Sequence, residues 1–391
     1  MWFFRSPTLV YGDDALDYLR ELNIHRALIV TDANIEAAGL VQKATERLDS
    51  QAALAIFREV EAEPSLATVQ RGAAALRAFD PQWIIAIGGG SVIDAAKAMW
   101  VLYENPDLDL EALAPMTPIV LRQRARLIAI PTTAGTGSEA TWAFVITLPG
   151  NPPRKLGSGH PLAVPDYAIV DPNMSRSAPQ QLTADSGMDA ITQAIEAFFS
   201  TWANDYTDGL SLAAARLGLE HLARAVHHPD DLIAREKMAN CAAIGGLAYI
   251  NSMVGLAHAM GHALGAIFHV PHGRAVGLFL PYVLEFYALE PSPTIQQRFV
   301  ELARFVGLAG DDADQAAKQL IARLRALARA VGQPLTIAAL GISESAFYEA
   351  LDALVDNTMS DTVLFGAPRQ PSLAELRRLF VCAFEGTPVT V

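Results

Sequence analysis

Cysteine is scarce in this sequence: its 391 residues include only Cys241 and Cys382. Two cysteines cannot form a disulfide framework, and neither lies in the spacing of a zinc ribbon. Basic residues are also few, with 29 Lys and Arg against 42 Asp and Glu, which gives a formal net charge of −13. Because a phosphate backbone or an anionic membrane repels such a surface, we expect neither nucleic acid nor a membrane as a partner. The negative net charge does not exclude small anionic ligands, because backbone amides can bind an anion locally.

Targeting and membrane-spanning signals are lacking as well. The first residues, MWFFRSPTLVYGDDAL, have no basic leader and no long apolar core, so we predict no signal peptide and a cytoplasmic protein. The apolar stretch 239–257 is interrupted by Asn240, Asn251 and Ser252. We therefore predict two buried helices with a break near Asn251 rather than a membrane span. The chain length suits two domains.

Short apolar runs alternate with helical patterns in the first part of the chain. This alternation predicts an α/β layer in which helices cover both faces of a parallel sheet. The buried strands are predicted at residues 26–32, 83–89, 126–133 and 167–174, with helices such as 64–79 and 91–103 between them.

After Pro179 the pattern changes to long segments of 3.6-residue period with few β-branched runs. We predict an α/β domain over residues 1–178 and an all-helical domain over 179–391. The predicted helices of the second domain cover 184–199, 206–225, 232–268, 293–306, 312–331, 343–356 and 372–385.

Two loops of the first domain carry ligand-binding features. Three glycines in GGGSVIDAAKA (88–98) follow a predicted strand and open a helix, whose free amides and dipole bind anions such as phosphate. The loop matches neither of the two common nucleotide-binding motifs. A tight turn that binds no ligand is therefore the alternative interpretation. A second loop, PTTAGTGSE (131–139), follows another strand. Ligands in open α/β sheets lie beyond the carboxyl ends of strands, so both loops are predicted to line one crevice.

Asp32 ends the first predicted strand. Its carboxylate could accept hydrogen bonds from a ribose diol and would repel a 2′-phosphate. It could equally be the N-cap of a helix, so both interpretations stay open.

Four of the nine histidines lie within GLAHAMGHALGAIFHVPHG, residues 255–273. His258 and His262 are four residues apart and share one helix face, and His272 follows a turn marked by Pro271. A lone histidine on an apolar helix is usually a core residue. Three around one turn, with few other charges, favour a metal site.

A divalent ion at such a site would also need a carboxylate. The segment TADSGMDAITQAIEAFF (183–199) places Asp189, Gln193 and Glu196 on one face of a predicted helix. Considered alone, this polar face predicts a helix side that is exposed to solvent.

Taken together, these segments resemble the iron-containing (group III) alcohol dehydrogenases, which include lactaldehyde, propanediol and butanol oxidoreductases. The resemblance implies an N-terminal Rossmann-like dinucleotide-binding domain, a C-terminal helical catalytic domain of dehydroquinate synthase-like architecture, and a metal in the cleft between them. It also implies a homodimer whose N-terminal strands pair. The motifs are TD at 31–32, GGGSVIDAAKA at 88–98, PTTAGTGSEAT at 131–141, PDYAIVDPNM at 165–174, GMDAITQAIEAF at 187–198 and GLAHAMGHALGAIFHVPHG at 255–273.

The resemblance also implies roles for individual residues. Asp32 matches an acidic residue beside the adenosine ribose, which favours NAD over NADP. His262 matches the histidine near the nicotinamide and the substrate, and His269 reads either as a cleft-lining residue that contacts substrate or as structural. The implied metal ligands are Asp189, His258 and His272. The implied cofactor contacts are Gly89, Gly90, Ser91, Asp94, Thr132, Thr133, Thr136, Val145 and Lys155.

Two residues depart from the family pattern. Gln193 stands where the family has a histidine ligand. Its carbonyl oxygen could bind the metal, water could fill the position, or the site could be metal-free; Fe²⁺ and Zn²⁺ both suit the remaining ligands. The second departure is Glu63, where relatives often have an asparagine near the adenosine.

The activity implied is that of an NAD(H)-dependent alcohol dehydrogenase or aldehyde reductase acting on a small neutral substrate. A divalent metal polarises the substrate oxygen while hydride passes to or from the nicotinamide, and His262 relays the proton.

Three alternatives remain. One is a metal-independent reductase similar to maleylacetate reductase. A phosphonoacetaldehyde reductase would need several basic residues, of which Arg154, Lys155 and Arg274 are the candidates. A lyase similar to dehydroquinate synthase is disfavoured by the aspartate of the GMDA motif and the scarcity of basic residues.

Overall fold

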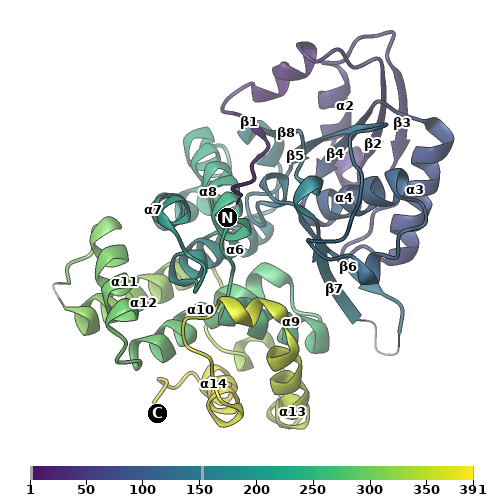
Figure 1. Ribbon diagram of the computed structural model, residues 1–391. Coiled ribbons are helices and arrows are strands. Elements are labelled where there is room, and N and C mark those ends of the chain that lie inside the picture. Colours follow the sequence, from purple (N-terminus) through teal and green to yellow (C-terminus); the bar gives the residue numbers. More distant parts are fainter. Residues whose placement is uncertain (1–2, 151–153, 311, 391) are drawn as a thin grey trace. The chain divides into compact units, whose positions relative to one another are not determined.

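The chain forms two units, Met1–Ala178 and Pro179–Val391. The computed structural model describes residues 3–150, 154–310 and 312–390. Within these residues the first unit contains all the strands and the second is built from helices (Figure 1). The predicted α/β domain followed by an all-helical region is therefore confirmed.

The first unit is built on a six-stranded parallel sheet in the order β1-β8-β5-β4-β2-β3. The central strand β4 is buried along its whole length, as expected of a strand covered on both faces. Its register with β5 pairs Gly88 with Pro131, so the loops that follow these two strands leave the sheet side by side. The strands are β1 Thr8–Tyr11, β2 Arg26–Val30, β3 Ala53–Phe57, β4 Trp83–Gly88, β5 Arg126–Pro131 and β8 Tyr167–Val170.

Helices cover both faces of this sheet. Apolar side chains of α3 and α4 pack on one face, where both helices lie in front of the strands in Figure 1, and η1 and α2 pack on the other. The α-helices are α1 Ala33–Ala37, α2 Leu40–Thr45, α3 Leu66–Phe79, α4 Gly90–Glu104 and α5 Pro172–Ser175. The 3₁₀ helices are η1 Ala15–Arg20, η2 Leu110–Ala112, η3 Ser138–Ala140 and η4 Pro161–Ala163.

The sequence patterns miss parts of this unit. Strand β3 lies at the sheet edge with alternate residues partly exposed, and β6 Ala143–Leu148 forms an antiparallel pair with β7 Arg154–Gly159. The strand predicted over 167–174 is wrong beyond Val170. There Asp171 caps α5 by accepting from the Asn173 N–H, and Pro172 occupies the first helical turn.

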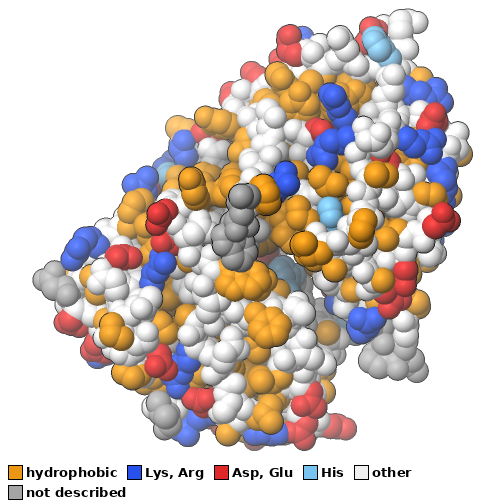
Figure 2. All heavy atoms as spheres, in the orientation of Figure 1, with side chains coloured by type: hydrophobic (Ala, Val, Ile, Leu, Met, Phe, Trp, Pro, Cys, Tyr) orange, Lys and Arg blue, Asp and Glu red, His pale blue; other side chains and the backbone are white. Residues whose placement is uncertain are grey.

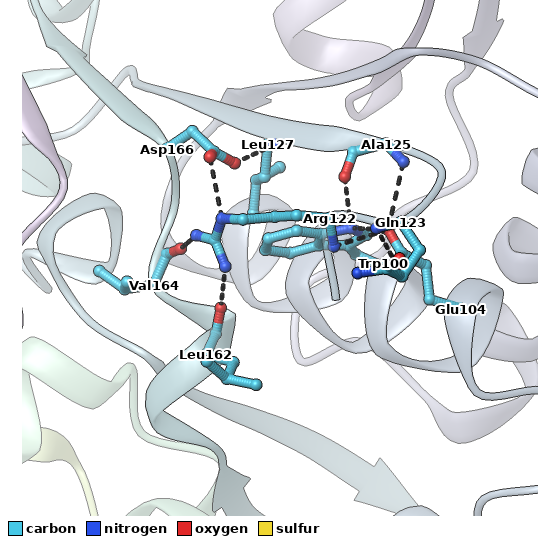
Figure 3. Close-up of polar contacts among 9 residues, drawn as sticks. All are labelled: Trp100, Glu104, Arg122, Gln123, Ala125, Leu127, Leu162, Val164 and Asp166. Atoms are coloured by element: carbon cyan, nitrogen blue, oxygen red, sulfur yellow. Dashed lines mark hydrogen bonds and ion pairs between the residues drawn. The ribbon is translucent and has the colours of Figure 1, made fainter. Parts of the chain in front are cut away.

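A polar network holds the turn that leads into β5 (Figure 3). The Arg122 guanidinium donates to Asp166 Oδ1 (2.9 Å) and to the carbonyls of Leu162 and Val164 (2.6 Å each). Glu104, the last residue of α4, accepts from the Trp100 indole and from the backbone N–H groups of Arg122, Gln123 and Ala125. These bonds fix the start of β5 against α4.

The second unit packs around α6, which is buried along most of its length. The run predicted as one helix over 232–268 is two, α8 and α9, which confirms the break expected near Asn251. No helix among the described residues is long and apolar enough to cross a membrane. The helices are α6 Gln180–Phe199, α7 Asp205–His227, α8 Leu232–Ile250, α9 Leu256–Phe268, α10 His272–Ala288, α11 Pro293–Phe305, α12 Ala313–Ala330, α13 Glu344–Ser360 and α14 Leu373–Glu385, with η5 Ala338–Leu340 and η6 Thr362–Gly366.

The helical patterns do not predict α10. It is buried on almost all sides and contains Pro281, so it shows neither a polar face nor an uninterrupted helical sequence.

Candidate metal centre and cofactor loops

Three side chains from three helices of the second unit converge on one point. Asp189 of α6 places its Oδ1 3.5 Å from Nε2 of His258 on α9 and 3.4 Å from Nε2 of His272 at the start of α10. One ligand atom from each residue lies within 4.8 Å of the others. Asp189 and His258 are buried, whereas the His272 side chain is 43% exposed. The structure therefore brings together the three metal ligands that the sequence resemblance implied.

The geometry of this cluster fits a divalent cation. The buried Oδ1 of Asp189 has no hydrogen-bond partner among the described residues. Ligand atoms about 2.1 Å from a tetrahedral ion lie ~3.4 Å apart, close to the two oxygen–nitrogen separations found here. An anionic oxygen and two imidazole nitrogens form a donor set that both Zn²⁺ and Fe²⁺ accept.

Glu196 orients the His258 ring. Its Oε2 forms a short hydrogen bond with Nδ1 of His258, and its Oε1 accepts from the Ala257 N–H at 2.6 Å. This arrangement directs Nε2 of His258 towards Asp189, as carboxylates do for histidines that bind metals. Sequence reasoning placed Glu196 on the polar face of its helix without a role. The signal that could have found it is its spacing of seven residues, two helical turns, from Asp189.

The charges of the cluster stabilise one another. Burial alone would lower the pKa of His258, but the neighbouring carboxylates of Glu196 and Asp189 raise it to about 10. Burial opposes the charge of Asp189 as well, yet His272 and His258 hold the pKa of Asp189 well below its usual range. The Asp189 carboxylate is therefore ionised at neutral pH and offers a cation a negatively charged oxygen ligand.

His262 lies beside this cluster with its own carboxylate partner. Its Nδ1 is 2.7 Å from Oδ2 of Asp361, whose other oxygen accepts from the Val363 N–H and caps η6. The ring stacks on His272 at 5.3 Å between centroids. Burial lowers the pKa of His262 despite Asp361, which favours the neutral imidazole. Sequence reasoning selected His262 but not Asp361, which lies 99 residues further along the chain.

The remaining predicted residues of this unit lie differently. His269 is the C-cap of α9 in the left-handed conformation (φ 56°), and the ring contacts among the described histidines join His258, His262 and His272 only. Gln193, one turn after Asp189, directs its Nε2 to the Ala242 carbonyl of α8 at 3.5 Å. Ligation by Gln193 and a substrate contact of His269 both stay predictions.

In the first unit the glycine and threonine loops pack directly on each other. A Cβ at Gly90 would lie 2.8 Å from Oγ1 and Cγ2 of Thr136, so only glycine permits this approach. Gly89 is the N-cap of α4, and a Cβ there would contact Thr133. The Thr132 N–H donates to the Gly88 carbonyl at 2.9 Å, and its hydroxyl is buried without a partner among the described residues. Glycine backbone and threonine hydroxyls are thus gathered at one helix N-terminus, where phosphate binds.

Asp94 and Lys97 hold the threonine loop against α4. Asp94 accepts from the Ser138 hydroxyl at 2.5 Å and from the Val145 N–H at 2.9 Å. The fully buried Lys97 donates to Ser138, Thr141 and the Ala143 carbonyl at 2.8–2.9 Å. Asp94 therefore has a structural function in addition to the predicted cofactor contact, and Lys97 is a residue that sequence reasoning missed.

Other predicted cofactor residues have partners of their own. Asp32 caps α1, with Oδ1 accepting from the N–H groups of Asn34 and Ile35. Lys155 forms a 2.7 Å ion pair with Glu63, whose φ of 58° is the left-handed conformation that asparagine adopts more readily. The Glu63 N–H also donates to the Ser91 hydroxyl at 3.4 Å. Glu63 thus links Ser91 to Lys155.

Comparison with known proteins gives concordant results. Residues 6–172 match the family described as iron-containing alcohol dehydrogenase, and residues 183–384 match the Fe-containing alcohol dehydrogenase family, C-terminal. The NADPH-dependent butanol dehydrogenase of Clostridium saccharobutylicum is 36% identical over 396 residues, 100% of this chain and 99% of the relative. The chain also matches the aldehyde-alcohol dehydrogenase 2 of Entamoeba histolytica at 35% identity over 98% of its own length, but it spans only 46% of that protein.

Among solved structures, the sulfoacetaldehyde reductase from Bifidobacterium kashiwanohense in complex with NAD⁺ is similar, with a TM-score of 0.85 and 27% identity. The similarity covers 98% of each chain. The fold is therefore shared along almost the whole length of both proteins.

Proposed function

Because this chain belongs to the iron-containing alcohol dehydrogenase family, we propose that it interconverts small neutral alcohols and aldehydes with NAD(H) and a divalent cation. The family makes it an oxidoreductase acting on CH–OH groups. The observation that carries the proposal is the convergence of Asp189, His258 and His272 around a buried carboxylate oxygen that has no hydrogen-bond partner among the described residues.

These three residues would hold Fe²⁺ or Zn²⁺, with the Gln193 carbonyl oxygen as a weaker fourth donor. A divalent cation at this position supplies a Lewis acid that polarises the oxygen of an alcohol or aldehyde. The protein's contribution is to hold the ligands in position, with Glu196 fixing the tautomer and orientation of His258.

His262 is the candidate proton carrier. Asp361 accepts its Nδ1–H, which leaves Nε2 of the neutral ring able to take or return a proton. The lowered pKa of His262 supports this role, because a base that is already protonated at neutral pH could not accept a proton. We propose that His269 contacts substrate at the end of α9 without taking part in proton transfer.

The proposed cofactor is NAD. A carboxylate at Asp32 accepts hydrogen bonds from a ribose diol and repels a 2′-phosphate. The butanol dehydrogenase relative is described as NADPH-dependent, whereas the similar sulfoacetaldehyde reductase was solved with NAD⁺. Cofactor choice therefore varies among similar proteins, and the charge of Asp32 supports NAD here. Its second carboxylate oxygen is not needed for the cap on α1.

A neutral substrate is supported by the ion pairs of the three candidate basic residues. Arg154 pairs with Glu111 at 2.9 Å, Lys155 with Glu63 at 2.7 Å, and Arg274 with Asp185 at 3.0 Å. Each cation is neutralised by a carboxylate of its own unit. This pattern argues against a phosphonate or sulfonate substrate, whose anionic group would need free cations.

We also propose a homodimer in the cytoplasm. Strand β1 is an edge strand that pairs only with β8 within the described sheet, and Tyr11 at its end is 69% exposed. A second copy pairing along β1 would cover this edge. Two buried cysteines in the thiol form suit a reducing compartment. On the visible face of each unit in Figure 2, acidic side chains lie among the basic ones, which together with the net charge of −13 supports the proposal that nucleic acid is not a partner.

The test begins with elemental analysis of protein purified without chelator. NADH oxidation is then measured over short aldehydes, with phosphonoacetaldehyde and sulfoacetaldehyde as anionic comparisons. We expect about one Fe or Zn per chain and activity confined to the neutral aldehydes. Full activity without metal would refute the Lewis-acid scheme, and preference for an anionic aldehyde would refute the substrate class. Light scattering of the same sample tests the dimer.

A further inference from the structure

Asp185 and Arg274 form a two-pronged ion pair next to the metal centre. Arg274 Nε donates to Oδ1 and Nη2 to Oδ2 of Asp185, each at 3.0 Å. Both side chains are largely buried, at 10% and 25% exposure. Parallel hydrogen bonds of this kind fix orientation as well as distance.

The pair is adjacent in sequence to two of the three candidate ligands. Asp185 precedes Asp189 by four residues, one turn of α6, and Arg274 follows His272 by two residues at the start of α10. The pair therefore joins the first turn of α10 to the turn of α6 that precedes Asp189.

Further contacts show that α6 and the start of α10 pack tightly where the ion pair joins them. Oδ1 of Asp185 also accepts from Gln333 Nε2 at 2.6 Å and from Gln181 Nε2 at 3.1 Å. Between His272 and Arg274, Gly273 lies so close to α6 that a Cβ there would be 2.2 Å from the Asp185 carbonyl oxygen. The backbone beside His272 thus touches the backbone of α6, and only glycine fits.

His272 needs such support more than the other ligands do. It is the first residue of α10, the N-cap Pro271 makes no side-chain cap, and the imidazole is the exposed member of the cluster. Helix ends fray unless they are held. By contrast, His258 is buried within α9 and oriented by Glu196.

We propose that the Asp185–Arg274 pair is a positioning device for the metal centre, which holds His272 at ligand distance from Asp189. The inference rests on the proposed function in that it presumes a cation at Asp189, His258 and His272. Because the pair's charges cancel, it acts through geometry rather than through the field at the ion. Arg274 is consequently a positioning residue and not a receptor for an anionic substrate.

The experiment compares variants of this pair with a second largely buried ion pair, which joins α10 to α12. Arg325 Nη1 binds Glu285 Oε1 at 2.7 Å with exposures of 26% and 16%, and Glu285 lies thirteen residues after His272, about 20 Å along α10. The test variants are Arg274→Lys, Arg274→Gln and Asp185→Asn, and the controls are Arg325→Lys and Glu285→Gln. The unmodified protein and each variant are stripped of metal and titrated with Co²⁺ and Zn²⁺, with far-UV circular dichroism to verify folding.

We expect the dissociation constants of the test variants to rise roughly 10- to 100-fold, as when the support of a metal ligand is removed. The visible Co²⁺ bands should change in shape and intensity, because loss of His272 alters the coordination geometry. Arg274→Lys keeps the charge, is the variant most certain to fold, and should still show the loss. The control variants should bind Co²⁺ like the unmodified protein.

If the three test variants bind the cations with the same affinity as the controls, the inference is wrong and the proposed function stays intact. Failure of the unmodified protein to bind either cation would overturn the proposed metal centre, and with it this inference. Cation binding by the unmodified protein therefore distinguishes the two failures.

Discussion

Glu196 and His258, 62 residues apart, form a short buried hydrogen bond that turns the imidazole towards Asp189. The same carboxylate accepts from the backbone at Ala257, so it fixes both the ring and the start of the helix that carries it. The proposed metal centre would therefore depend on a residue that is not itself one of the candidate ligands.

Replacing Glu196 by Gln is expected to weaken cation binding about 10- to 100-fold. The glutamine carbonyl can still accept from Nδ1 of His258, but the negative charge that makes Nε2 a stronger donor is lost. Zn²⁺ competition with a fluorescent chelator measures the effect. Glu285→Gln, at the far end of α10, provides the control, and equal affinities in both variants would contradict the orienting role.

Asp361→Asn should lower kcat by roughly two orders of magnitude and leave KM for the aldehyde nearly unchanged. An asparagine can donate its amide N–H to Nδ1 of His262, which would place the proton on the wrong ring nitrogen. Steady-state kinetics in both directions give the two constants. A large rise in KM with constant kcat would show that Asp361 supports substrate binding instead. Asp352→Asn, in the exposed ion pair with Arg377, is the control.

Gln193→His should tighten Zn²⁺ binding by about tenfold if position 193 faces the cation, because imidazole is a stronger donor than an amide oxygen. Loss of the Nε2 contact with the Ala242 carbonyl should cost little, since that bond is long at 3.5 Å. Isothermal titration calorimetry of the stripped protein measures the change. An unaltered affinity would place residue 193 outside the coordination shell.

Asp32→Ser separates the two functions of Asp32. Serine keeps the N-cap of α1, so stability should change by less than ~1 kcal/mol. The charge is removed, and the ratio of kcat/KM for NADPH over NADH should rise by at least about tenfold. If the ratio stays constant while thermal stability is unchanged, Asp32 is a helix cap and nothing more.

Two buried ionisable side chains, Glu139 and Lys97, predict how stability depends on pH. Burial raises the pKa of Glu139 to about 7, so the folded chain keeps a proton that the unfolded chain releases above about pH 4.5. The free energy of unfolding should therefore fall as pH rises from 4.5 to 7. Glu139→Gln should abolish this term, on the order of 3 kcal/mol, in urea unfolding curves.

Lys97 predicts the opposite dependence of stability on pH, at higher pH. Burial lowers its pKa to about 8, so between pH 8 and 10.5 the unfolded chain binds the proton that the folded chain has lost. The free energy of unfolding should rise with pH there, and Lys97→Met should remove that rise. Parallel pH profiles of the variants and the unmodified protein would contradict both assignments.

Local sequence was sufficient for the parts of this protein that depend on neighbours along the chain. Apolar runs predict β2, β4, β5 and β8, and the break near Asn251 separates α8 from α9. Glycines and hydroxyls mark the two loops beyond β4 and β5. The spacing of His258 and His262 places both on one side of α9, because the period of the helix determines which residues share a face.

Tertiary packing alone decided which partners these faces meet. Glu196 reaches His258, Asp361 reaches His262, and Asp185 reaches Arg274 across separations of 62, 99 and 89 residues. Helix periodicity specifies a face but not the element opposite it, and α10, which carries His272, has no polar face to reveal it. The candidate ligands were therefore predicted from sequence motifs, whereas the carboxylates that contact His258, His262 and Arg274 were found only where α6, α9, α10 and η6 pack together.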